Sequence, residues 1–202
     1  TPPAVVTVEP PQMGPKRVFI QRDAQVPSFQ AVWHAPAVHD PGSIPMDILG
    51  RVLLRGESSR LYRRLVRQEQ LASSVFGGAS RTIDPYLFAV HVKPKPGADL
   101  ARIEAVIEEE LAKIKKEGLA DSEIQKVLNA VRSDFYRSLQ TIAGKAYQLA
   151  ETETAYGGFE RMFTLMDDYA AVTNAKIIEA ANQYFTDNNK TVGTLVPEGG
   201  RK

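Results

Sequence analysis

The amino-acid sequence predicts an α+β fold, in which an antiparallel sheet carries helices packed on one face. Two observations lead to this prediction. Short β-rich runs and amphipathic helical segments alternate up to residue 97, whereas residues 98–185 are almost wholly helical and one β-rich run closes the chain. The composition is globular, with 43% hydrophobic and 24% charged residues, and 202 residues are enough for a substantial core. Strands and helices in this order are typical of a sheet covered on one side.

The first fifteen residues are expected to form a linker. This segment is rich in proline, which removes backbone donors and favours extended chain. The alternation in residues 5–8 allows one short edge strand. Because the chain starts at Thr1 rather than Met and opens on a linker, we expect something to be missing upstream. We therefore divide the chain into a proline-rich linker at residues 1–15 and one domain at residues 16–202.

Runs of β-branched and aromatic residues predict the strands of the sheet. The third and fourth runs form a hairpin, whose turn contains Asp84 and Pro85. Pro94 and Pro96 end the fourth run, and Pro197 ends the last one. The predicted strands are residues 16–22, 28–34, 73–79, 86–93 and 190–196.

Helical spacing of apolar residues begins near Pro45, and Gly56 is expected to end this first helix. Ser58 or Ser59 is expected to cap a second helix, from which Arg63, Arg64 and Arg67 would face outward. Further along, Gly118 ends a long helix, Asp121 is expected to cap the next, and Thr173 caps the last. The buried stripe of the helix after Asp121 is predicted to be Ile124, Val127, Leu128, Val131 and Phe135. The remaining helices are predicted at residues 98–117, 141–156, 159–170 and 173–185.

The charge balance disfavours nucleic acid as a partner. Lys and Arg number 25 against 24 Asp and Glu, which gives a formal net charge of +1 and no global field to attract a polyanion or an anionic membrane. The chain has no cysteine, so a disulfide, a thiolate zinc site and a cysteine nucleophile are excluded. No apolar run approaches the roughly 20 residues of a membrane-spanning helix.

A search for catalytic chemistry finds no self-contained site. His34 and His39 are separated by Pro36, so no helix aligns them as zinc ligands, and His91 is isolated on a strand. Nucleophile-elbow and phosphate-binding motifs are absent from the sequence. Glu108 to Glu110 and the lysines that follow them are expected to form a solvated helix face. We therefore predict no catalytic residue, no metal ligand and no cofactor in this chain.

Residues 56–76 carry a family resemblance. They read Gly-Glu-Ser-Ser-Arg-Leu-Tyr, then a helix, then Leu-Ala-Ser-Ser-Val-Phe, and they resemble a segment in the C-terminal half of insulinase/pitrilysin-type zinc metallopeptidases, which include the mitochondrial processing peptidases. Residues 98–118 are similar to a long helix of that family, and residues 121–158 to the helices that follow it. Residues 172–197, which end in Leu-Val-Pro, are similar to its closing helix and strand. The resemblance covers nearly the whole chain from residue 16.

The resemblance implies a LuxS/processing-peptidase-like metallohydrolase fold, in which two such halves form a chamber around a peptide substrate. In this family the N-terminal half binds zinc through an H-x-x-E-H motif, which this chain lacks. We therefore expect the chain to be the non-catalytic C-terminal half of a zinc metalloendopeptidase, which forms half of the chamber and docks with the zinc-bearing half. Zinc is expected in the missing N-terminal half.

Many family members carry an Arg and, seven residues later, a Tyr in this half, and the pair holds substrate and steadies the oxyanion. The corresponding positions here are Val66 and Ser73, neither of which can replace its counterpart. Arg67 is one residue out of register and is a weak substitute. In two-subunit members different polypeptides carry the zinc motif and the Arg/Tyr pair. The resemblance therefore implies a second peptidase-like subunit as a partner.

Two alternatives stay open. The substitutions at Val66 and Ser73 equally fit a catalytically dead structural or interaction homologue of the peptidase fold. An unrelated enzyme with a site assembled from scattered residues is a more distant alternative. Similar exported bacterial proteins suggest a periplasmic or secreted location, which the residues themselves do not specify.

Overall fold

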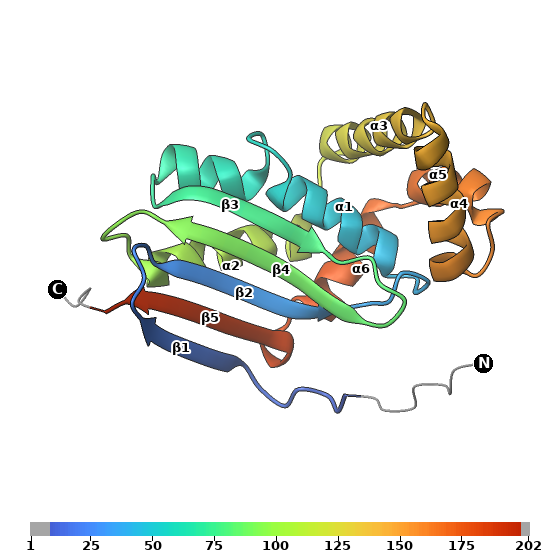
Figure 1. Cartoon of the computed structure of the whole chain (residues 1–202). Coiled ribbons are helices and arrows are strands. Elements are labelled where there is room, and N and C mark those ends of the chain that lie inside the picture. The colour runs from blue at the N-terminus through green and yellow to red at the C-terminus, as the bar shows by residue number, and fades with distance from the viewer. Residues whose placement is uncertain (1–8, 199–202) are drawn as a thin grey trace.

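The computed structural model describes residues 9–198, which form a five-stranded sheet with helices on one side (Figure 1). The strand order is β1-β5-β2-β4-β3, and every neighbouring pair is antiparallel except β1 and β5. The α+β fold class is confirmed, although one strand pair is parallel. Strand β5 lies between β1 and β2, antiparallel to β2 and parallel to β1. The strands are β1 (Lys16–Arg22), β2 (Ser28–Ala35), β3 (Ala72–Ala79), β4 (Tyr86–Pro94) and β5 (Lys190–Pro197).

The helices form one layer against the sheet and a second group beyond its end. Helices α1, α2 and α6 lie behind the sheet, whereas α3, α4 and α5 lie together at one end (Figure 1). The bounds are α1 (Ser43–Leu54), η1 (Tyr62–Gln68), α2 (Leu100–Glu117), α3 (Asp121–Ser138), α4 (Ile142–Tyr156), α5 (Arg161–Ala170), α6 (Asn174–Tyr184) and η2 (Asp187–Asn189). Helix η1 is a π-helix, and η2 is a short 3₁₀ helix. In residues 9–198 no helix is long and apolar enough to cross a membrane.

Three aromatic side chains fill the core between the sheet and the helix layer. Trp33 from β2, Phe88 from β4 and Phe185 after α6 are each at most 2% exposed. Phe185 meets Trp33 with ring centroids 5.3 Å apart and Phe88 at 4.9 Å, both edge to face. Such contacts add to the stabilisation from buried apolar area. The cluster therefore joins the closing segment of the chain to the centre of the sheet.

Two glycines allow α1 to lie close to β3. A Cβ at Gly50 would lie 3.1 Å from the Cα of Gly78, so a larger side chain would push helix and strand apart. Gly77 has φ +140°, and a Cβ there would lie 2.0 Å from the carbonyl oxygen of Ala89. The Gly-Gly pair in β3 thus serves a close approach of backbones.

The predicted helix starts need correction. Neither Ser58 nor Ser59 caps a helix with its side chain, because the Ser58 hydroxyl accepts from Lys126 and the Ser59 hydroxyl has no hydrogen-bond partner. Asp121 is already inside α3, whose preceding residue Ala120 donates its N–H to Glu123 at 3.0 Å. Thr141 and Thr173 do cap α4 and α6, as their side chains accept backbone N–H groups.

Helix α3 buries less than its sequence pattern predicts. Only Val127 and Val131 of the five-residue stripe are buried, whereas Ile124, Leu128 and Phe135 are half-buried. The reason is that α3 extends past the end of the sheet.

At the N-terminus, Gln12 donates to the carbonyl oxygen of Lys190 at 2.8 Å, and the strand suggested at residues 5–8 lies outside the described residues. The boundary at residue 16 stays a prediction.

Candidate functional site

One face of the sheet is left uncovered by the described helices (Figure 1). Burial alternates along β2 and β4, because successive side chains point to opposite faces of the sheet. Every second side chain packs under the helices, and the ones between them point away from the helices. We call the second set the open face. Its members, from β1 to β3, are Lys16, Val18, Ile20, Arg22, Pro197, Leu195, Gly193, Thr191, Ser28, Gln30, Val32, His34, Leu87, Ala89, His91, Lys93, Ser74, Phe76 and Gly78.

An aromatic pair stands at the β3 side of the open face. Phe76 is paired across the strands with His91, and their rings stack with centroids 5.1 Å apart and planes 15° from parallel. Phe76 remains 49% exposed. On the same face, Ala89 and Lys93 flank His91 along β4 and Gln30 lies opposite His91 on β2, so the aromatic pair is an exposed apolar spot among small and polar side chains.

The two positions expected from the resemblance lie on either side of one turn. Val66 lies in η1, where it is half-buried and packs against the core. Ser73 is exposed at a register shift of β3, and its hydroxyl donates to the carbonyl oxygen of Lys93 at 3.2 Å. Between them, Gln70 adopts the left-handed region with φ +53°. Whether these positions touch a substrate stays a prediction.

Arg67, the out-of-register substitute, is turned toward solvent. Its guanidinium bonds to Glu57 and lies over the ring of Tyr62, with 5.9 Å between its Cζ and the ring centroid. Its side chain is 60% exposed, as is usual for a surface ion pair. Arg67 and Val66 therefore occupy different environments of the same helix.

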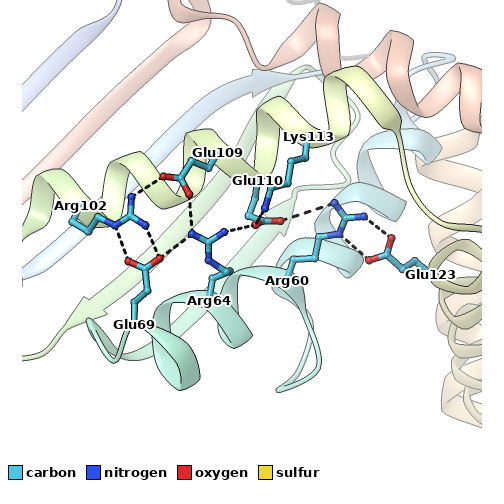
Figure 2. A network of polar contacts seen from close by, with 8 residues as sticks. All are labelled: Arg60, Arg64, Glu69, Arg102, Glu109, Glu110, Lys113 and Glu123. Atoms are coloured by element: carbon cyan, nitrogen blue, oxygen red, sulfur yellow. Dashed lines mark hydrogen bonds and ion pairs between the residues drawn. The ribbon is translucent and has the colours of Figure 1, made fainter.

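A network of charged side chains holds η1 against α2, as Figure 2 shows. Arg64 is its centre and donates to Glu69 at 2.8 Å, Glu109 at 2.8 Å and Glu110 at 2.9 Å. Arg102 bonds twice to Glu69, each time at 2.7 Å, and once to Glu109 at 2.6 Å, which closes a ring of contacts with Arg64. The prediction that Arg64 faces outward is wrong, because carboxylates from α2 surround it.

The acidic run of α2 is likewise not a plain solvated face. Glu110 is only 4% exposed and also binds Lys113 at 2.8 Å. The hydrogen bond from Arg64 is the main cause that lowers the pKa of Glu109, and the one from Arg102 does so for Glu69. The ion pairs of Glu69, Glu109 and Glu110 with Arg64 fix η1, and with it position 66, to the helix layer. Local sequence patterns do not reveal this network, because the pairs that join η1 and Glu69 to α2 connect residues 33 to 46 positions apart.

Arg60 extends the network toward α3. It donates to both carboxylate oxygens of Glu123, at 2.8 and 2.6 Å (Figure 2). This bidentate geometry is the strongest form of a carboxylate–guanidinium pair. It lowers the pKa of Glu123, chiefly through the hydrogen bond from Arg60. Helices α2 and α3 are thus both tied to the segment that precedes β3.

The three histidines lie in separate surroundings. His34 shares a 2.7 Å hydrogen bond with Asn189, His39 lies 3.8 Å from Asp40, and His91 stacks on Phe76. Within the described part of the chain, no group of three or more His, Asp or Glu side chains is placed to hold a metal ion.

Comparison with known proteins places this geometry in a family. The family model described as the peptidase M16 inactive domain matches residues 1–131. The zinc protease PqqE of Helicobacter pylori is 24% identical over 190 residues, which are 94% of this chain and 43% of that protein.

Solved structures agree on the fold. A protease from Helicobacter pylori superposes with a TM-score of 0.89 at 22% identity, over 96% of this chain and 47% of that one. The periplasmic protease PqqL from Escherichia coli gives a TM-score of 0.71 at 15% identity, over 92% of this chain and 21% of that one. The chain thus spans less than half the length of each of these relatives.

Proposed function

Because the chain belongs to the family of peptidase M16 inactive domains, we propose that it forms the non-catalytic wall of a peptidase chamber. The zinc-bearing half, which supplies the metal and the catalytic base, would lie across from it. The observation that carries this proposal is the open face, a continuous side of the sheet that no described helix covers (Figure 1). A bare side of the sheet on which Val18, Ile20 and Phe76 stay exposed fits a surface that confines another chain.

The peptide is proposed to bind in extended form along this surface. Strands β1 and β3 are the edges of the sheet within the described residues, so main-chain groups there are available for an added strand. Phe76 and His91 lie next to the β3 edge and would contact alternate side chains of such a peptide. Val66 and Ser73 offer no long polar donor at the turn before β3. We therefore propose that a second peptidase-like subunit supplies the Arg/Tyr pair.

The whole protein is further proposed to be an exported zinc metalloendopeptidase. Support comes from the zinc protease name of the Helicobacter pylori relative and from the periplasmic description of the Escherichia coli structure. The rival proposal is a structural homologue without peptidase activity, and the residues at 66 and 73 favour it as much as they favour the two-subunit enzyme.

Photo-crosslinking tests the chamber wall. Phe76 is replaced by p-benzoylphenylalanine in the full-length polypeptide, which is stripped of metal so that a bound peptide is not cleaved. The control carries the same substitution at Phe163, which is 68% exposed on α5 in the helix group. We expect a labelled peptide to crosslink at position 76 and not at position 163. Equal labelling at both positions, or labelling only at 163, would refute the assignment of the open face.

A further inference from the structure

A cavity of about 220 Å³ lies in the helix layer, between α1, the loop that follows it and α3. Its cations are Arg51, Arg55 and Lys126, and its apolar wall is made by Val52, Val127 and Ala130. Ser58 and Ser59 of the loop complete the lining, with Glu123 at the edge. Because α1 packs on the covered side of the sheet, this cavity is separate from the open face (Figure 1).

Two buried polar atoms of the lining have unused hydrogen-bonding capacity. In residues 9–198, the buried side-chain nitrogen and oxygen atoms without a hydrogen-bond partner are Arg51 Nη1 and Ser59 Oγ. Ser59 is only 3% exposed, and the nearest carboxylate of Arg51 Nη1 is that of Asp134 at 3.5 Å. Buried polar groups in proteins are almost always bonded. Both residues belong to the lining of this cavity, although the two atoms themselves lie beneath its surface.

The charges of the lining define the occupant. Arg51 is paired with Asp47 at 2.7 Å, and Arg55 with Asp134 at 2.8 Å. Glu123 forms an ion pair with Arg60 at 2.6 Å. Lys126 is exposed and donates to the hydroxyl of Ser58, and among the described residues no carboxylate lies within ion-pair distance of its ammonium group. The lining thus has one cation without a carboxylate partner, beside the apolar wall, and this combination would suit an anionic ligand with an apolar part.

We propose that this cavity binds a carboxylate carried on a short aliphatic group. The carboxylate would lie between Lys126 and Ser58, where it gains a charge-assisted hydrogen bond. The aliphatic part would pack on Val52 and Val127. The volume is below the roughly 300–1,000 Å³ of sites for drug-sized ligands, so the occupant is small. A free short-chain acid and the C-terminus of a peptide that ends in an aliphatic residue both present this chemistry.

The test uses the full-length polypeptide and isothermal titration calorimetry. The probes are isovalerate, N-acetyl-Gly-Val with a free carboxylate, the same dipeptide as its amide, and inorganic phosphate. We expect the carboxylates to bind with a dissociation constant of about 1 mM or lower, and the amide and phosphate to bind at least about tenfold more weakly. Preference for the dipeptide acid identifies a peptide C-terminus as the source, and preference for isovalerate identifies a free acid. Absence of carboxylate binding, or equal binding of the amide, overturns the proposal.

Variants of one exposed lysine separate this cavity from other binding sites for carboxylates, such as a zinc ion. Lys126→Gln is expected to weaken binding about tenfold, because a charged partner is lost, whereas Lys126→Arg retains it. The matched control is Lys116→Gln, an exposed lysine of α2 away from the cavity, which should bind as the unmodified protein does. Binding to zinc would not depend on Lys126. If Lys126→Gln and Lys116→Gln bind equally well, the cavity is not the site.

Discussion

Replacing Arg64 by methionine would remove the centre of the charged network and keep most of the aliphatic volume. Arg64 is 20% exposed and contacts Glu69, Glu109 and Glu110, of which Glu110 is 6% exposed at its side chain. Removing one partner of a buried ion pair leaves the other charge uncompensated and costs about 3–5 kcal/mol. Glu110 retains Lys113 at 2.8 Å, so we expect a smaller loss of about 2–3 kcal/mol in the stability of this region.

Hydrogen exchange followed by mass spectrometry of the full-length polypeptide measures this loss locally. The amide of Glu69, which bonds to the Arg64 carbonyl at 2.9 Å, reports on the end of η1. A loss of about 2–3 kcal/mol corresponds to exchange about 30- to 160-fold faster in this peptide. The control is Arg67→Met in the same helix, whose 60%-exposed pair with Glu57 is expected to contribute at most about 1 kcal/mol. Equal acceleration in both variants would show that the network does not hold η1.

Three further predictions concern stability. Arg102 holds the pKa of Glu69 below the ordinary 4.5. The stability that this ionised acid contributes is therefore complete above pH 4.5 and is lost as the pH falls through the lowered pKa. Circular dichroism in an acid titration checks this, and unchanged stability down to about pH 2 would contradict it. Gly77→Ala should lower the free energy of unfolding by more than about 3 kcal/mol in urea denaturation, because its Cβ would meet a carbonyl oxygen at 2.0 Å. The control is Gly193→Ala, which has open space around its Cβ and should change the free energy of unfolding by less than about 0.5 kcal/mol. Phe185→Ala should cost about 3–5 kcal/mol by the same assay, since the ring is 2% exposed in the aromatic core, and a loss below about 1 kcal/mol would refute the role of that core.

Local sequence signals predicted the strands and most helices. The alternation in residues 86–93 gave β4 nearly to its ends, and the glycine at 118 marked the end of α2. Thr173 was predicted as a cap because a hydroxyl before a helical run satisfies free N–H groups at its start, whereas the cap at Thr141 was seen only in the structure. These features depend on neighbours in the chain and are readable without a fold.

Features that depend on distant segments were missed. The parallel pairing of β1 with β5 joins strands at opposite ends of the chain, and no local pattern encodes it. Arg64 and Glu110 meet only because η1 packs on α2. Ser58 and Ser59 precede a helix that opens through a turn, so a pattern that predicts caps failed there. Positions 66 and 73 came from the resemblance alone, and the stack of Phe76 on His91 needed the register of β3 against β4.

The most direct test of the central claim is to purify the full-length polypeptide with its natural partners and to determine its composition and bound metal by mass spectrometry. We expect an intact H-x-x-E-H motif upstream of this chain, zinc bound there, and a partner that carries the Arg/Tyr pair. Zinc should persist when His34, His39 and His91 are all replaced, and it should be lost when the upstream motif is changed. Recovery of a polypeptide whose zinc motif is broken, without bound metal, would contradict the peptidase and identify the chain as part of a structural homologue.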